Sequence, residues 1–401
     1  MSSAAPPRTP GTAGEVFRAF LLLGLSAFGG PVAHVGYFRA AFVARRGWLD
    51  DAQFAQLLAI CQVLPGPASS QLGFGIGLLR AGWAGAAAAF VAFTLPSALL
   101  MLALVWLAPA GDAPVGAAVV RGLKLVAVAV VAHGLIAMAR QLAPDARRAA
   151  IAVSAALLVL ASGAAWAQLG AIVVGAALGI LLCRHVPLPP AAPLPARVSA
   201  GAATAAAVAF AALLALALAW TPQAPTPGAL AAVFYRAGAL VFGGGHVVLP
   251  LLEAGVVAPG WLDAERFLAG YGAAQAMPGP MFTLAAYLGG ATLPGQPLPA
   301  ALAALAGIFL PGFLLLVAAL PAWSALARRP GAVATLAGIN AAVIGLLAAA
   351  LYDPVLSQGI GGSADAAIAA VGLLLLVLFR LNALWVVAWC VGASLLATAV
   401  A

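Results

Sequence analysis

The sequence predicts an all-α polytopic membrane protein, built from two inverted-topology repeats with about 13 transmembrane helices, several of them broken by Gly and Pro. The first supporting observation is composition: of the 401 residues, 65% are hydrophobic and only 7% are charged. An ordinary soluble domain has about 25% charged residues, because it needs a surface that water wets. Most of this chain must therefore face lipid or other helices. The second and third observations are recurring apolar runs and an internal repeat.

Apolar runs long enough to cross a bilayer follow one another along the whole chain. A hydrocarbon core about 30 Å thick takes roughly 20 apolar residues per helix. The recurrence of such runs excludes a soluble enzyme with a single anchor. We expect spans at 16–37, 53–80, 83–108, 115–139, 148–163, 165–183, 199–220, 230–252, 267–292, 299–320, 332–351, 364–379 and 382–401.

The charges predict how the chain is oriented. The net charge is +8, but the 18 basic residues stand singly or in pairs between the apolar runs. That pattern is typical of the cytoplasmic loops of a bacterial inner-membrane protein and not of a nucleic-acid groove. It favours a cytoplasmic N-terminus and a periplasmic C-terminus. Arg39, Arg45 and Arg46 do not fit this orientation. Either their loop is basic for a functional reason, or the first span is a broken helix that does not cross simply.

Composition also divides the chain into segments. Residues 1–14 are rich in Pro, Ala, Ser, Thr and Gly and predict a disordered tail, without the basic region that a signal peptide needs. We expect the first repeat at 15–183, a Pro-rich linker at 184–198, a connecting transmembrane helix at 199–220 and the second repeat at 221–401.

The internal repeat is the most informative pattern. Gly47-Trp48-Leu49-Asp50 recurs 213 residues later as Gly260-Trp261-Leu262-Asp263. Other landmarks recur in the same order at nearly the same offset: Phe28-Gly29-Gly30 and Phe242-Gly243-Gly244, His34 and His246, Phe54 and Phe267, Gln62 and Gln275, Pro65-Gly66-Pro67 and Pro278-Gly279-Pro280, Leu95-Pro96 and Leu310-Pro311, and Gly122-Leu123-Lys124 and Gly338-Ile339-Asn340. The chain is therefore a tandem duplication. Equivalent spans are an odd number of spans apart, so the two halves should be inverted, which is a transporter architecture.

The two Pro-Gly-Pro segments predict breaks in the helices. Proline removes a backbone donor and restricts the residue before it, so Gln62 to Pro67 cannot form a continuous helix. A new half-helix starting near Pro67, with Ser69 and Ser70 in its first turn, would present free N–H groups to an anion. Residues 275–283, ending at Thr283, repeat this arrangement. The alternative is that these glycines and prolines only kink or pack membrane helices.

Other polar residues leave two interpretations open. His34 and His246 either carry protons and bind substrate or are structural. Lys124 either serves a site within the membrane or extends to the interface. Asp50 and Asp263 predict helix N-caps. Cys61, Cys183 and Cys390 match no metal spacing, and no cluster suggests catalysis, a metal or a cofactor.

Three motifs occur in each half: FGGPVAHV, WLD and QVLPGP in the first, and FGGGHVVLP, WLD and QAMPGP in the second. In these motifs the sequence resembles the chromate ion transporter (CHR) family in its long, two-domain form. The resemblance implies export of chromate from the cytoplasm, coupled to the proton motive force. The alternatives are a porter for another oxyanion such as sulfate, a membrane-embedded enzyme and a scaffold. The sequence leaves open whether the protein forms a homodimer. The expected substrate site comprises Phe28, Gly29, Gly30, His34, Gln62, Pro65, Gly66, Pro67, Ser69, Ser70, Lys124, Phe242, Gly243, Gly244, His246, Gln275, Pro278, Gly279, Pro280 and Thr283.

Overall fold

The computed structural model describes residues 11–107, 114–162, 166–186, 194, 198–242, 245–326 and 329–400, and the secondary structure of these residues is helical. Residues 1–10 of the predicted tail, most of the Pro-rich linker, and Gly243 and Gly244 lie outside the described residues. Gly11 is described: its N–H donates to the carbonyl of Arg80 at 3.1 Å.

The elements follow the two halves of the sequence. The first half contains α1 (Ala13–Ser26), α2 (Gly30–Phe38), η1 (Arg39–Arg45), α3 (Asp51–Val63), α4 (Ala68–Leu107), α5 (Pro114–Leu142), α6 (Ala146–Ser162) and α7 (Trp166–Leu182). The helix α8 (Ala200–Ala219) connects the halves. The second half contains α9 (Pro227–Leu240), η2 (Gly245–Val247), α10 (Val248–Val256), α11 (Ala264–Ala274), η3 (Met281–Thr283), α12 (Leu284–Thr292), α13 (Pro297–Leu326), α14 (Pro330–Ala350), η4 (Leu351–Leu356), α15 (Ser357–Gly359), α16 (Ser363–Val377) and α17 (Ala383–Val400).

The chain at α1, α2 and η1 folds back on itself instead of crossing. The Phe20 ring of α1 stacks on Phe42 of η1 with centroids 4.6 Å apart. The Trp48 indole N–H donates to the Glu15 carboxylate at 3.1 Å, so the returning segment ends beside the start of α1. Thus the first predicted span is a broken helical hairpin. This topology explains the basic 39–46 segment, because that segment lies on the same face of the molecule as the start of α1.

A second hairpin follows in the same orientation. Helix α3 enters from that face, the chain breaks at 64–67, and the first part of α4 returns, so that Arg80 forms an ion pair with Glu15 at 3.0 Å. The chain then reverses at Ala81, where the backbone leaves the helical region. The first full crossing is residues 83–107 of α4. We call the face that carries Glu15, Trp48 and Arg80 the N face.

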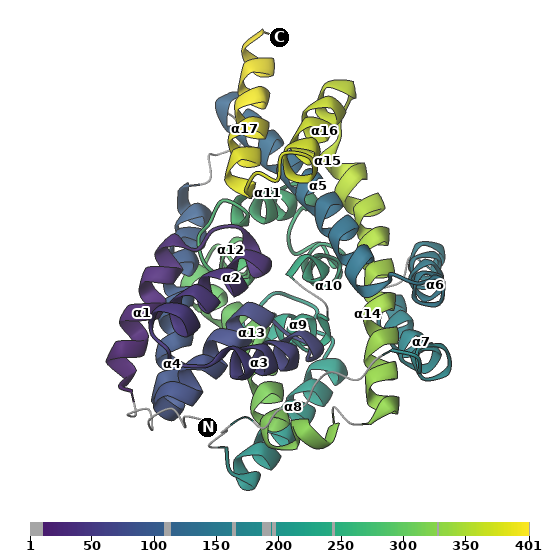
Figure 1. Cartoon of the computed structure of the whole chain (residues 1–401). Helices are drawn as coiled ribbons and strands as arrows, with labels where there is room; N and C mark the ends of the chain where they lie inside the picture. Colours follow the sequence, from purple (N-terminus) through teal and green to yellow (C-terminus); the bar gives the residue numbers. More distant parts are fainter. Residues whose placement is uncertain are drawn as a thin grey trace.

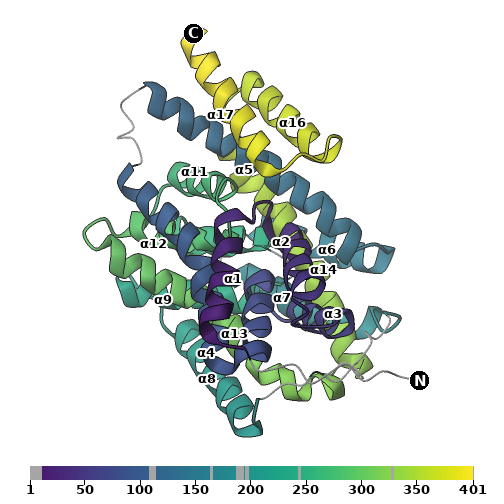
Figure 2. The same cartoon turned by 60° about the vertical axis from the view of Figure 1, so that its left-hand side comes forward.

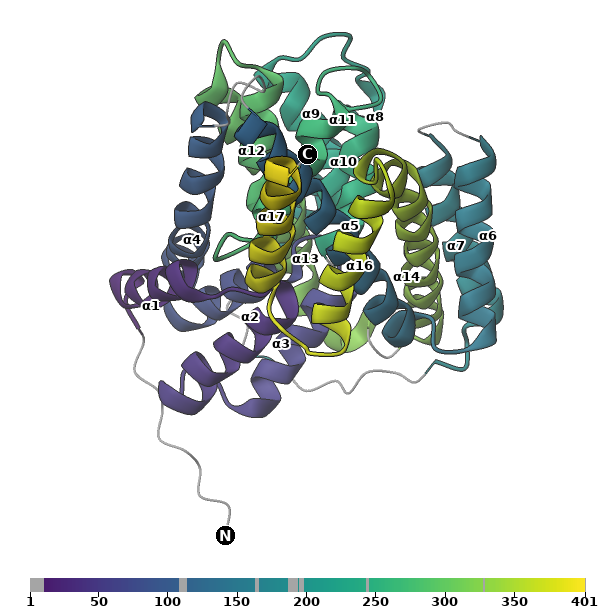
Figure 3. The same cartoon turned by 90° about the horizontal axis from the view of Figure 1, so that it is seen from above.

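The second half repeats these hairpins from the opposite face, the C face. The end of α12 lies beside the end of α4, because a Cβ on Gly290 would be 3.1 Å from a Val105 methyl group. The start of α11 lies beside the start of α5, where Lys124 and Glu265 form an ion pair at 3.1 Å. Figure 3 shows α1–α3 (purple) toward one end of the molecule and α9–α11 (green) toward the opposite end. The prediction of inverted repeats is confirmed.

The number of crossings differs from the predicted count. Thirteen spans are not confirmed, because four of the predicted segments (16–37, 53–80, 230–252 and 267–292) return to the face from which they entered. Within the described residues, the segments that run from one face toward the other are 83–107 of α4 and helices α5, α6, α7, α8, α13, α14, α16 and α17, of which α6, α7 and α16 have only 15–17 residues. The longest of these helices have the length and composition of membrane spans: 115–142, 200–219, 297–323 and 330–359. The described chain starts at the N face and ends at the C face.

Each half packs its last two helices against the other half. Helices α6 and α7 pack on α14, with Gly179 and Gly338 in backbone contact, and α16 and α17 pack on α5. Figures 1 and 2 show α6 and α7 beside α14, and α16 and α17 beside α5. The halves are therefore interlocked around a shared centre, and neither half is an independent bundle.

The two repeated Trp-Leu-Asp turns cap helices, as predicted. The Asp50 carboxylate accepts a hydrogen bond from the Gln53 N–H at 2.8 Å, and the Asp263 carboxylate accepts one from the Arg266 N–H at 2.7 Å. These caps fix where α3 and α11 enter from the N and C faces.

Candidate functional site

We call the breaks of the four hairpins the tips, and they are joined in two pairs inside the molecule. The Gly66 N–H donates to the Val241 carbonyl at 2.8 Å, and the Gly279 N–H donates to the Ala27 carbonyl at 2.9 Å. Gly66 and Gly279 are equivalent positions of the two repeats, and so are Ala27 and Val241. Each Pro-Gly-Pro tip is therefore bonded to the Phe-Gly-Gly tip of the other half.

Only glycine fits at the two positions whose N–H groups donate these hydrogen bonds. Gly66 has φ +124° and Gly279 has φ +85°, a region that side chains disfavour. A Cβ on Gly66 would lie 2.8 Å from the Gly312 Cα, next to Pro311 within α13. A Cβ on Gly279 would lie 3.0 Å from the carbonyl oxygen of Phe93 in α4. Both tips thus rest directly on the backbone of a long helix from the opposite half.

The first Pro-Gly-Pro tip ends in a set of hydrogen-bond donors. The first backbone bond of α4 runs from the Gln71 N–H to the Pro67 carbonyl at 2.9 Å, so the N–H groups of residues 68–70 have no acceptor within the helix. Ser69 and Ser70 are buried, and the Ser70 hydroxyl has no hydrogen-bond partner among the described residues. The predicted half-helix with free donors is therefore present in this half.

The second Pro-Gly-Pro tip is more fully occupied by its own contacts. The Thr283 hydroxyl donates to the Pro280 carbonyl at 2.8 Å, and the Gln275 amide contacts the Met281 sulfur at 3.2 Å. The chain continues from Pro280 as a single 3₁₀ turn before α12 begins. Gln62, the equivalent of Gln275, is exposed at the end of α3. Equivalent residues therefore have different surroundings in the two halves.

The two histidines also differ. His34 is fully buried, and its Nε2 lies 3.2 Å from the Ala27 carbonyl, the same carbonyl that Gly279 reaches. Nε2 must carry the proton to donate there, and Nδ1 has no partner among the described residues. His246 instead lies against α11, with Nδ1 2.7 Å from the Tyr271 hydroxyl. Only His34 is bonded directly to a tip.

The remaining predicted site residues are placed as follows. Phe28 is half-buried, and Gly29 in the left-handed conformation caps the start of α2 at Gly30. Phe242 is buried beside Val241. The structure does not bring Lys124 to the tips, because its ammonium group is paired with Glu265 at the C face.

Gln71 is a residue of the site that sequence reasoning missed. Its side chain is fully buried, and its amide donates to the Pro65 carbonyl at 3.1 Å and to the Gly312 carbonyl at 2.9 Å. It therefore joins the first Pro-Gly-Pro tip to α13 beside Pro311. The signal that could have found it is a polar residue in an apolar run, at a position where the second half has Leu284.

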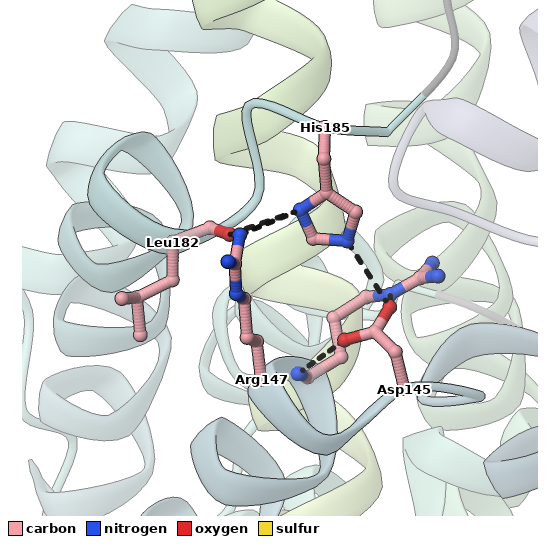
Figure 4. A network of polar contacts seen from close by, with 5 residues as sticks. Asp145, Arg147, Leu182 and His185 are labelled. Carbon is pink, nitrogen blue, oxygen red and sulfur yellow. Dashed lines mark hydrogen bonds and ion pairs between the residues drawn. The ribbon is translucent and has the colours of Figure 1, made fainter.

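A separate polar network lies at the N face, away from the tips. Figure 4 shows Asp145 between α5 and α6 and His185 after α7, with the His185 ring 3.4 Å from the Asp145 carboxylate. The backbone N–H of Arg148 donates to the Asp145 carboxylate, and the Arg148 and His185 side chains bond it too. Together they hold the pKa of Asp145 well below its usual range. This network joins the N-face ends of α6 and α7 and contributes nothing to the central site.

Comparison with known sequences places this architecture. Residues 14–181 and 228–395 each match the Chromate transporter family. The chain belongs to the chromate transporter family. It is 30% identical to the chromate transport protein of Pseudomonas aeruginosa, over 88% of this chain and 83% of that protein. Identity is also 30% to the chromate transport protein of Cupriavidus metallidurans, over 88% of this chain and 87% of that protein. No solved structure matches.

Membership of this family has two consequences. The chain is a multi-pass membrane protein of a transporter family and not of an enzyme family. The two matched stretches coincide with the two interlocked halves, so each pair of bonded tips joins both copies of the family's repeat.

Proposed function

We propose that this chain exports chromate, or a closely related tetrahedral oxyanion, by binding it between the four tips. The observation that carries the proposal is the reciprocal hydrogen bonding of Gly66 with Val241 and of Gly279 with Ala27. Each of these bonds joins broken helices from the two inverted halves inside the molecule, and alternating access requires a substrate site between such halves. The names of the relatives in Pseudomonas and Cupriavidus support chromate as the substrate.

The chemistry of the tips suits an oxyanion, which accepts hydrogen bonds and donates few. The start of α4 offers the N–H groups of residues 68–70 and the Ser69 and Ser70 hydroxyls. One helix N-terminus stabilises an anion by about 0.3–2 kcal/mol, which is small beside the cost of desolvating a doubly charged ion. Several donors must therefore act together. We expect Gln62, Gln275 and Thr283 to join them when the substrate is bound.

We further propose that the N face is cytoplasmic and that the proton motive force drives export. Most of the described basic residues lie toward the N face: Arg18, Arg39, Arg45, Arg46, Arg80, Arg140, Arg147, Arg148, Arg184, Arg329 and Arg380. Positive charge accumulates in cytoplasmic loops, which favours this orientation. His34, buried at the tip with an unpartnered ring nitrogen, is the side chain that we expect to carry the proton.

Uptake into everted membrane vesicles tests the proposal. We expect labelled chromate to accumulate when a proton gradient is imposed and to stop when the gradient is collapsed. Labelled sulfate, a tetrahedral dianion of similar shape, measures how narrow the specificity is. Accumulation of sulfate but not of chromate would assign the chain to the other oxyanion, and accumulation of neither would refute oxyanion transport.

A further inference from the structure

Arg236 occupies an unusual position, deep within a broken helix of the second half. It is nine residues beyond Pro227, where α9 begins at the C face, and five residues before Val241, whose carbonyl accepts the Gly66 N–H. At a rise of about 1.5 Å per residue, it lies about 13 Å from the start of the helix and about 7 Å along the axis from the tip. Arg236 therefore lies well inside the hairpin, between the C face and the tip.

No described residue forms an ion pair or a hydrogen bond with the Arg236 side chain. In contrast, Lys124 is paired with Glu265 and Arg80 with Glu15. Arg236 is half-buried, and its neighbours along the chain, Tyr235 and Ala237, are buried. Arg236 is therefore a partly buried positive charge that has no carboxylate partner among the described residues.

The connecting helix α8 accounts for this shelter. The residue equivalent to Arg236 in the first half is Leu22, which is 62% exposed and suits lipid. Helix α8 has no counterpart beside α1 and packs along α9, where the Tyr235 hydroxyl donates to the Phe210 carbonyl at 3.2 Å. The face of α1 that carries Leu22 is thus exposed, whereas the equivalent face of α9 is partly covered by α8. At this covered position the sequence has Arg236.

An unpaired charge at this depth is costly, and in membrane proteins such residues mark the pathways of ions and substrates. The N–H groups and hydroxyls at the start of α4 are neutral donors, which are too weak to neutralise a doubly charged ion. Guanidinium groups bind oxyanions with two parallel hydrogen bonds and stay charged when partly buried. We infer that Arg236 is the cationic ligand of the transported oxyanion, on the C-face side of the tips. This inference rests on the proposed function and names the residue that neutralises the substrate.

Binding and transport by charge variants test the inference. In purified full-length protein, we expect Arg236→Gln to weaken chromate binding at least tenfold, measured by the thermal stabilisation that chromate gives, and to raise the KM for uptake. Arg236→Lys should restore part of the loss. Arg18→Gln is the matched control, because Arg18 is the exposed arginine of the equivalent helix α1. It should bind chromate like the parent.

A labelling experiment covers the case in which Arg236→Gln does not fold. In a chain whose native cysteines are replaced, Arg236→Cys should regain chromate binding when a positively charged thiol reagent modifies it, but not when a neutral reagent of similar size does. Parental binding by Arg236→Gln, or equal rescue by both reagents, would overturn the role of Arg236 while leaving oxyanion transport intact. A parent protein that binds neither chromate nor sulfate would overturn both.

Discussion

The hairpins of the two halves share one sequence pattern but are not equally covered. All described residues from Phe267 to Ala274 of α11 are buried, and so is most of α12. In the first half, Tyr37 of α2 is 42% exposed, and Gln62, one residue before the end of α3, is exposed. The difference comes from α5, which lies along α11, whereas the described residues of α3 make no comparable contact with α14.

The contact of α5 with α11 depends on residues that the first half does not repeat. Gly272 packs against the backbone of Leu123, and Lys124 is paired with Glu265. The equivalents of Lys124 and Glu265 are Asn340 and Ala52, which cannot form an ion pair. Under the proposed mechanism, this structure is closed at the C face, and the opposite state would bring α3 toward α14. The contact between α5 and α11, which the first half does not repeat, then defines which state of the transport cycle this structure represents.

The largest effect should come from filling the space between α5 and α11. Gly272→Ala would place a methyl group against the Leu123 carbonyl, so α11 must shift. Such overpacking costs about 1–3 kcal/mol, and we expect a melting temperature several degrees lower and a transport rate reduced about tenfold. Gly170→Ala in α7 is the control, because nothing lies within 4 Å of its added methyl group. A parental rate for Gly272→Ala would show that closure at the C face does not depend on this contact.

A smaller effect should follow from making the first tip resemble the second. Gln71→Leu introduces the residue type of the equivalent Leu284 and leaves the Pro65 and Gly312 carbonyls without their donor. Loss of buried hydrogen bonds costs about 1–3 kcal/mol. We expect lower thermal stability and weaker chromate binding, with no change in Gln223→Leu, which alters an exposed loop. Unchanged binding in Gln71→Leu would mean that the first tip keeps its conformation without the two hydrogen bonds from the Gln71 amide.

The smallest effect should come from the ion pair at the C face. Lys124 is 17% and Glu265 60% exposed, and partly exposed pairs contribute about 0.2–1 kcal/mol. We expect Lys124→Gln to lower transport about two- to fivefold, and Lys124→Glu combined with Glu265→Lys to recover most of it. Arg147→Gln, in the screened N-face network, should change transport less. Equal losses in Lys124→Gln and Arg147→Gln, at matched expression, would remove any special role for the pair.

Much of the architecture was predictable from the sequence, because it depends on local chemistry and on repetition. The repeated Trp-Leu-Asp turns located the caps of α3 and α11, and Pro-Gly-Pro located the breaks. Length alone could not separate a crossing from a hairpin, since residues 16–37 are long enough to span the bilayer. The return of that segment depends on packing of Phe20 against Phe42, which no periodicity reveals.

The site was only partly predictable for a related reason. The Gly66 and Gly279 positions were found because both repeats keep them. The carbonyls that they reach, the fastening by Gln71 and the pairing of Lys124 with Glu265 join segments that are far apart in sequence. A duplicated pattern also predicts the same surroundings for equivalent residues in the two halves. The different hydrogen bonding of Ser70 and Thr283 could therefore appear only in the structure.

The central claim is that the paired tips form the substrate site, and substitution of their glycines tests it most directly. Initial rates of labelled chromate uptake into everted vesicles would be compared for Gly66→Ala and Gly279→Ala. The controls are Gly47→Ala and Gly260→Ala, which also have positive φ (58° and 76°) but open space around the added methyl group. We expect both tip variants to lose uptake at least about tenfold, while the controls, where a side chain also meets a positive φ, keep most of it. Parental uptake by both tip variants, in folded protein at equal abundance, would contradict a site between the tips.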